Sequence, residues 1–223
     1  MFNMVIVAAT GGIGRHLLSQ ALTAGHQVTA VVRNPGKLRD IPARVVRCDL
    51  ARPARGVLED AIAGADAVLS ALGAPTGAEA GVASRGTQAL VGAMRATGGR
   101  RIIAVSAASV GTVPSPGRPH PPRYNPGDGI VTRHVFAPVA KRLFRRHYLD
   151  LAVMEDVLRE SGLDWTVSRP PRLLHRALWP AYRTAVDINV RGGMFISRAD
   201  VARHMIAMVD QPGTIRHTVA VAY

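Results

Sequence analysis

The sequence predicts a doubly wound α/β fold, in which a parallel sheet lies between two layers of helices. Short apolar runs alternate with helix-length amphipathic segments, as expected for strands joined by crossover helices. Glycines stand where those helices should stop. The length of 223 residues suits one compact domain with a large core. We therefore expect a single domain over residues 1–223, three-layered, with the strand order 3-2-1-4-5-6-7.

The predicted strands are continuous Val/Ile/Ala stretches, as is typical of strands that are covered on both faces. They span residues 4–8, 28–32, 44–47, 67–70, 101–106, 164–169 and 218–221. The helices are expected over residues 13–24, 55–63, 79–97, 149–161 and 198–209, with Gly25, Gly64, Gly98 and Gly162 at helix ends. In the helix over 149–161, Met154 and Leu158 form the core face, and Glu155 and Asp156 are expected to point largely toward solvent.

Two segments do not fit the alternation. Residues 107–138 carry seven prolines and no sustained period, and this segment leaves the carboxyl end of a strand, where ligands of open α/β sheets bind. It is interpreted either as a lid or as an ordinary surface loop. Together with residues 173–195, it is the candidate for a small substrate-covering part.

Composition narrows the class of protein. The formal charge of +13 is spread along the chain and aromatic residues make up 4%, which favours a solvated basic surface over a nucleic-acid interface. Cys48 is the only cysteine, and neither a basic leader nor a membrane-length apolar run is visible. These features predict a cytoplasmic protein without a nucleic-acid or membrane partner, either a monomer or a small homo-oligomer.

A strand, a glycine-rich turn and an amphipathic helix follow one another near the N-terminus. The free N–H groups and positive dipole end of a helix N-terminus accept a pyrophosphate, provided that no side chain blocks the backbone. Gly11 and Gly12 permit that approach, and Gly14 lets the helix pack closely on the strand. With Thr10 as a hydroxyl donor and Ile13, they are expected to bind a nicotinamide dinucleotide in a Rossmann-type fold. The alternative is a structural turn that binds no ligand.

The end of the second predicted strand bears on the choice of cofactor. An acidic residue there binds the ribose hydroxyls of NAD, whereas a basic residue accommodates the 2′-phosphate of NADP. This chain has Arg33, and Arg15 and Lys37 would add to the same positive pocket. NADP(H) is therefore favoured over NAD(H), the alternative being an exposed arginine in an arginine-rich protein.

Over nearly its whole length, the sequence resembles the atypical short-chain dehydrogenase/reductases, specifically the NmrA-like branch with the biliverdin reductase B/flavin reductase proteins. The resemblance rests on nine stretches. They are Ala9-Thr10-Gly11-Gly12-Ile13-Gly14, Val32-Arg33-Asn34-Pro35, Cys48-Asp49-Leu50, Gly64-Ala65-Asp66-Ala67-Val68, Ala71-Leu72-Gly73, Val105-Ser106-Ala107, Ser161-Gly162-Leu163-Asp164-Trp165-Thr166, Arg169-Pro170-Pro171 and Ile196-Ser197-Arg198-Ala199-Asp200-Val201-Ala202.

The resemblance implies further site residues. Asp49 and Leu50 would flank the adenine, the run Ala71, Leu72 and Gly73 would line the adenosine and pyrophosphate, Ser106 would face the nicotinamide, and Pro170 would border it. Each has a structural alternative, because Asp49 can cap the helix that follows, Ser106 can satisfy local backbone, and the proline can simply end a strand.

The sequence departs from the family pattern at three places. Ala8 replaces the first glycine of the turn, which crowds it slightly. The catalytic Tyr-x-x-x-Lys pair of typical dehydrogenases is missing, since His147 and Leu151 align with it, and Tyr148 lacks the lysine that would lower its pKa. Ala107 stands where the biliverdin/flavin reductases carry a second hydroxyl.

The favoured function is an NADPH-dependent reductase that passes hydride to a flat, conjugated acceptor such as a flavin, quinone or tetrapyrrole, with Ser106 hydrogen-bonded to the carboxamide or the acceptor. A non-catalytic, redox-sensing regulator of the NmrA type remains an alternative. A nucleotide-sugar epimerase or dehydratase fits less well, because it uses the missing tyrosine and lysine. The eight dispersed histidines show no spacing that predicts a metal site.

Overall fold

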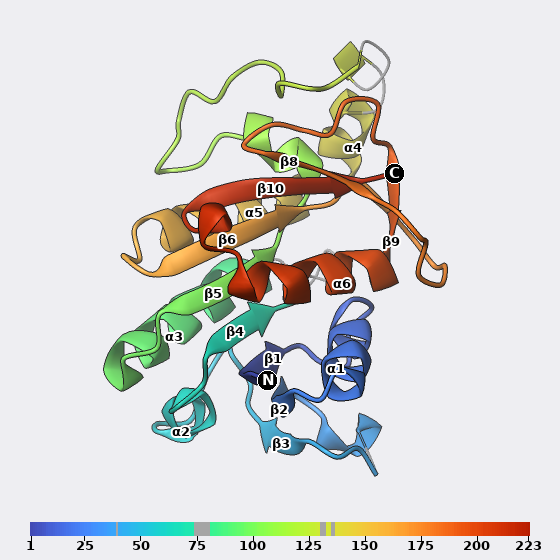
Figure 1. Cartoon of the computed structure of the whole chain (residues 1–223). Helices are drawn as coiled ribbons and strands as arrows, with labels where there is room; N and C mark the ends of the chain where they lie inside the picture. Colours follow the sequence, from blue (N-terminus) through green and yellow to red (C-terminus); the bar gives the residue numbers. More distant parts are fainter. Residues whose placement is uncertain (39, 74–80, 130–132, 135–136) are drawn as a thin grey trace.

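An eight-stranded sheet forms the centre of the computed structural model, which describes all residues except 39, 74–80, 130–132 and 135–136 (Figure 1). The strand order is β3-β2-β1-β4-β5-β6-β10-β8. The strands are β1 Asn3–Val7, β2 Gln27–Val32, β3 Arg44–Arg47, β4 Ala67–Ser70, β5 Arg101–Val105, β6 Asp164–Arg169, β8 Arg183–Val186 and β10 His217–Ala222. The first seven strands in this order run parallel, which confirms the predicted topology. The antiparallel edge strand β8 was not predicted.

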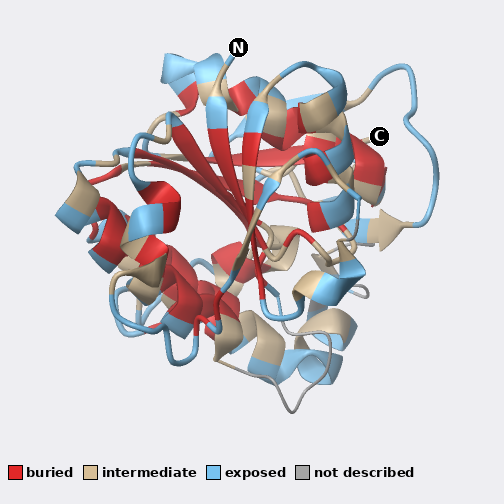
Figure 2. Cartoon of the chain, turned by 90° about the horizontal axis from the view of Figure 1, so that it is seen from below, coloured by how far each residue is buried: buried red, intermediate tan, exposed pale blue. Residues whose placement is uncertain are grey.

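Helices cover both faces of the sheet, and this confirms the three-layer α/β architecture (Figure 1). The helices are α1 Gly14–Thr23, α2 Val57–Ile62, α3 Val82–Thr97, α4 Ala137–Leu143, α5 Arg145–Arg159 and α6 Arg198–Ala207. Along β1, Met4 and Ile6 pack in the layer with α1 and α6, whereas Val5 and Val7 pack in the layer with α2, α3 and α5. Figure 2 shows the strands buried between the two layers, as the apolar runs predict.

Helix α5 differs from the sequence-based expectation in two respects. It begins at Arg145, four residues before the predicted start at residue 149. The orientation predicted for two acidic residues was wrong, because Glu155 and Asp156 are both buried. The simple amphipathic pattern assumed that only the sheet covers the helix, whereas the proline-rich segment covers it from another side. The backbone N–H of Gly117 in that segment donates to Asp156 Oδ2 at 2.9 Å.

Both predicted covering segments contain short regular elements that the sequence did not predict. The first contains a short 3₁₀ helix over Ala108–Thr112 and ends in α4, whose first residues lie at its boundary. The second contains β8, which joins the main sheet through β10. The small parallel pair of β7 Arg172–Leu174 and β9 Phe195–Ser197 frames this segment. Local apolar pattern does not reveal such short strands, since pairing rather than burial defines them.

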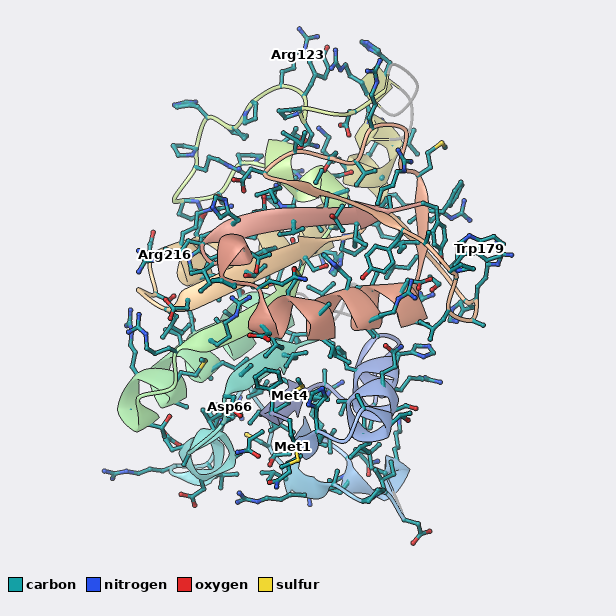
Figure 3. All side chains as sticks on the ribbon, in the orientation of Figure 1. Met1, Met4, Asp66, Arg123, Trp179 and Arg216 are labelled. Carbon is teal, nitrogen blue, oxygen red and sulfur yellow. The ribbon has the colours of Figure 1, made fainter. Side chains whose placement is uncertain are left out.

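Asn189 joins the two segments. Its side-chain Nδ2 donates to Asp128 Oδ1 at 2.7 Å, and its backbone N–H donates to the Pro126 carbonyl at 2.8 Å. In Figure 3, Arg123 of the first segment and Trp179 of the second lie at the periphery of the molecule. The segments therefore contact each other while exposing outward-pointing side chains. No described helix is long and apolar enough to cross a membrane.

Candidate functional site

Every predicted site residue follows a parallel strand at its carboxyl end. Because the strands are parallel, these residues lie along the same edge of the sheet, as the sequence analysis expected. In the order of the sheet they are Asp49 and Leu50 after β3, Arg33 after β2, Thr10, Gly11, Gly12, Ile13 and Gly14 after β1, Ala71, Leu72 and Gly73 after β4, Ser106 after β5, and Pro170 as the residue that follows β6.

The glycine-rich turn is closed by backbone contacts to Ala8. The N–H of Gly11 donates to the Ala8 carbonyl oxygen at 2.9 Å. A Cβ on Gly14 would clash with that same oxygen, so only glycine lets α1 begin this close to β1. Ala8 itself has φ of 58°, a left-handed conformation that glycine adopts at much lower cost. Ile13 is buried and packs in the core with α1, so it anchors the turn.

A groove of about 660 Å³ opens beside this turn. Thr10, Arg15 and Lys37 are among its lining residues. The structure thus brings together the two additional cations that the sequence analysis assigned to a 2′-phosphate pocket. Arg33 is exposed directly after β2, outside the lining of this groove. Another groove, of about 670 Å³, lies at the amino ends of β1, β2 and β3 and contains none of the predicted site residues.

Of the predicted site residues after β3 and β4, some are exposed and others are buried. Asp49 is exposed, and its Oδ1 accepts a hydrogen bond from the Ala51 N–H at 3.1 Å, which makes a local turn rather than a helix cap because α2 begins only at Val57. Leu50 and Leu72 are buried and meet at Gly86 of α3, where an added Cβ would contact both side chains. Both side chains therefore pack in the core, between this edge of the sheet and α3.

His147 of α5 reaches the same edge. Its Cε1 lies 3.8 Å from the position that a Cβ on Gly73 would occupy, and its Nδ1 is buried without a hydrogen-bond partner in the described part of the chain. Burial lowers the pKa of His147, although Asp150 opposes the shift. Burial likewise raises the pKa of the neighbouring Tyr148, against a smaller effect of a hydrogen bond with Ser109. At neutral pH, His147 is therefore uncharged and Tyr148 is a weak acid.

Ser106 belongs to a buried polar network that sequence reasoning did not find. Its Oγ donates to Glu155 Oε1 at 2.8 Å, and Arg169 forms two charge-assisted hydrogen bonds with the same carboxylate. Arg159 reaches it from the helix surface at 2.6 Å. Burial alone would raise the pKa of Glu155, but Arg169, Arg159 and Ser106 together lower it. The carboxylate is consequently ionised, and it receives the only proton that the Ser106 hydroxyl can donate.

A signal for this network was present in the sequence. Glu155 is four residues after Leu151 and three before Leu158, and this spacing places all three on one helix face. Leu151 and Leu158 are both buried, so a carboxylate between them needed a buried cationic partner. At the end of β6, Pro170 is buried too, and its carbonyl accepts the Ala108 N–H at 2.9 Å. It thereby fastens the start of the proline-rich segment to the sheet.

Comparison with known proteins agrees with this architecture. Residues 8–212 match the family model for NAD(P)H-binding proteins. The uncharacterized protein YwnB from Bacillus subtilis is 26% identical over 216 residues, covering 92% of this chain and 90% of its own.

Two solved structures extend the comparison. The anaerobillin reductase ChuY from Escherichia coli O157:H7 has 21% identity and a TM-score of 0.76, over 99% of this chain and 96% of that chain. SP1627 from Streptococcus pneumoniae TIGR4, a proposed NADH-flavin reductase, has 22% identity and a TM-score of 0.75, over 100% and 99% of the two chains. At these identities the likeness establishes the shared fold.

Proposed function

This chain belongs to the NAD(P)H-binding family, and we propose that it is an NADPH-dependent reductase acting on a flat, conjugated acceptor such as a flavin, quinone or tetrapyrrole. The observation that carries the proposal is the convergence at one sheet edge of the glycine turn, the groove of Arg15 and Lys37, and Ser106. ChuY and SP1627, which share the fold, are an anaerobillin reductase and a proposed NADH-flavin reductase.

The residues present fit a phosphorylated dinucleotide. The absence of a side chain at Gly14 lets the first turn of α1 approach β1, and Gly11 keeps the preceding backbone bare. Such an exposed backbone at a helix start receives phosphate oxygens. Arg15 and Lys37 would hold the additional 2′-phosphate of NADPH, and Arg33, directly after β2, would add a further positive charge at the same sheet edge.

Ser106 is suited to orient the reacting end of the ligands. When bound, the nicotinamide supplies the hydride. Because the Ser106 proton is engaged by ionised Glu155, its oxygen can offer only lone pairs to a ligand. This favours an N–H partner, either on the carboxamide or on the acceptor. Arg169 fixes Glu155 and thus fixes the rotamer of Ser106.

Proton supply favours conjugated acceptors over simple carbonyl substrates. His147 is uncharged at neutral pH, and Tyr148 has a raised pKa, so neither is a ready acid. Reduction of a simple ketone creates an alkoxide that needs a proton at once. A flavin, quinone or tetrapyrrole spreads the negative charge over its conjugated system and can then take a proton from water. The chain therefore contributes mainly orientation and exclusion of water.

The direct test follows NADPH and NADH oxidation at 340 nm with purified protein and a panel of FMN, riboflavin, quinones and biliverdin. We expect rapid loss of NADPH with at least one acceptor. Ser106→Ala should reduce kcat for that acceptor about tenfold, whereas Ser109→Ala, in the 3₁₀ helix nearby, is a matched hydroxyl control with a smaller effect.

Two outcomes would contradict the proposal in different ways. Tight NADPH binding by calorimetry without oxidation by any acceptor would favour a redox-sensing regulator over a reductase. Failure to bind either dinucleotide would exclude both functions and leave the glycine turn a structural element.

A further inference from the structure

Arg198 lies across the glycine turn although it comes from the C-terminal part of the chain. It is the first residue of α6, directly after β9. Its Nε is 2.8 Å and its Cδ 3.0 Å from the position that a Cβ on Gly12 would occupy. The side chain of Arg198 thus fills the space that a residue larger than glycine would take. The three atoms nearest to that position all belong to Arg198, so a larger residue at 12 would displace the arginine side chain.

Arg198 forms no ion pair and donates no hydrogen bond within the described part of the chain, and its Nη1 is buried. The other arginines with a buried unpaired nitrogen each have another partner, which for Arg133 is the Tyr124 ring, 4.6 Å away at its centroid. Arg118 donates to the Val110 carbonyl through Nη2, and Arg203 pairs with Asp200 at 2.8 Å. A buried guanidinium nitrogen without an acceptor is costly, and this indicates that the acceptor is a ligand.

The surroundings of Arg198 are cationic. Arg15 and His16 occupy the first turn of α1, which holds no acidic residue among those the structure describes. Burial, Arg15, Arg198 and His175 all lower the pKa of His16, which therefore stays uncharged at neutral pH. Arg15 and Arg198 both place positive charge beside His16, so an anion would meet a favourable potential there. Asp40 lines the groove of Arg15 and Lys37.

The backbone of Arg198 is held firmly in place. Ser197 caps α6 by accepting the Asp200 N–H at 2.9 Å, and its hydroxyl donates to Asp200 Oδ2 at 2.7 Å. The Tyr223 hydroxyl also donates to Asp200, at 2.5 Å. These bonds fix the backbone at the start of α6, from which Arg198 extends. Ligand binding therefore costs little backbone conformational entropy at this position.

We propose that Arg198, at the start of α6 beside α1, pairs with the pyrophosphate of the bound dinucleotide at the glycine turn. This inference rests on the proposed binding of NADPH at that turn. The planar guanidinium fork of arginine matches phosphate oxygens bidentately. Arg15 and Lys37 line the groove to which the 2′-phosphate is assigned, and Arg198 is not among its lining residues, so the bridging phosphates are the anion left for Arg198.

The test compares a ligand with the pyrophosphate and one without it. Calorimetry would measure the Kd of NADPH, NADH and 2′-AMP for the wild-type protein, Arg198→Met and Arg198→Lys. We expect Arg198→Met to raise the Kd of both dinucleotides at least tenfold and to leave the Kd of 2′-AMP unchanged. Arg198→Lys should recover part of the affinity, because it restores the charge without the fork.

Two further variants serve in case Arg198→Met does not fold and as a control for the loss of a positive charge. Gly12→Ala retains the charge but displaces the arginine, and it should weaken NADPH binding severalfold even if Arg198→Met does not fold. Arg100→Ala removes an exposed arginine at the opposite sheet edge and should bind as the wild-type protein does. Unchanged dinucleotide binding by Arg198→Met, or equal weakening of NADPH and 2′-AMP, would overturn the inference alone. A wild-type protein that binds no dinucleotide would overturn the proposed function with it.

Discussion

The carbonyl oxygen of Ala8 occupies the space in which a side chain on Gly14 would begin. Strand β1 and helix α1 are therefore in direct backbone contact at the turn. Both residues carry a conformational demand, since Gly14 must lack a Cβ and Ala8 must adopt φ of 58°. The chain has the required glycine at position 14, whereas at position 8 it has an alanine in a strained conformation.

Gly14→Ala should destabilise the protein by at least about 3 kcal/mol, because backbone rather than a flexible side chain blocks the added methyl group. Gly92→Ala is the matched control. Gly92 is an exposed glycine inside α3 with open space around it, and its replacement should stabilise by about 0.5–1 kcal/mol. Urea unfolding of the two variants measures the difference. Equal effects would mean that the close contact at Ala8 does not exist.

Ala8→Gly should stabilise the folded protein by about 1 kcal/mol, since it removes the cost of a left-handed alanine. Ala9→Gly, one residue later, lacks that strain and removes a fully buried methyl group, so it should destabilise. Thermal unfolding of both variants gives the two signs. A loss of stability in Ala8→Gly would contradict the strain assigned to this turn.

Glu155→Gln should cost about 3–5 kcal/mol, because it leaves the buried guanidinium of Arg169 without its counter-charge. The lowered pKa of Glu155 also gives a pH dependence. Its ionised form is favoured in the folded state, so its contribution is complete above the ordinary pKa of 4.5 and is lost as the pH falls through the folded value. Glu160→Gln, at the exposed residue that follows α5, should change stability by less than about 0.5 kcal/mol.

His204 should also make the folded protein less stable in acid, because it is a buried neutral group that gains a positive charge when it is protonated. Burial lowers the pKa of His204 from 6.5 to about 4, so between these values the unfolded chain takes up a proton that the folded chain does not. Stability should therefore fall by about 3 kcal/mol as the pH drops from 6.5 to below 4.

Urea unfolding of His204→Phe between pH 7 and pH 4 tests this contribution. The stability of the variant should depend less on pH over that range than the stability of the wild-type protein. His120→Phe, at an exposed position, serves as the control and should keep the wild-type slope. An identical slope in His204→Phe would show that another group titrates.

Arg33→Ala and Lys37→Ala should each raise the Kd of NADPH about tenfold, or about 1.4 kcal/mol, and leave the Kd of NADH within about twofold. The reason is that only NADPH carries the 2′-phosphate. Calorimetry with both dinucleotides measures the ratio, and Arg100→Ala controls for the loss of a positive charge elsewhere. Equal weakening of NADPH and NADH would remove the basis for NADP preference.

The sequence by itself determined the order of the parallel strands and the edge at which the site lies. Continuous apolar runs such as Val5 to Val7 define buried strands, and helices between them force parallel connections with a fixed hand. Once the topology is set, residues that follow the strands, from Gly11 to Ser106, meet at the carboxyl edge. These are consequences of local pattern and chain connectivity, and both can be deduced from the printed residues.

Tertiary structure alone decided the partners of the polar side chains. Glu155 was predicted to face solvent, yet it is buried and pairs with Arg169 from β6. Arg198 looked like the start of a distant helix, yet it rests on Gly12 because α1 and α6 share one face of the sheet. Such contacts join residues far apart in the chain, so local periodicity can indicate that a residue is buried but not which side chain it meets. They form only when the packed elements fix which side chains meet.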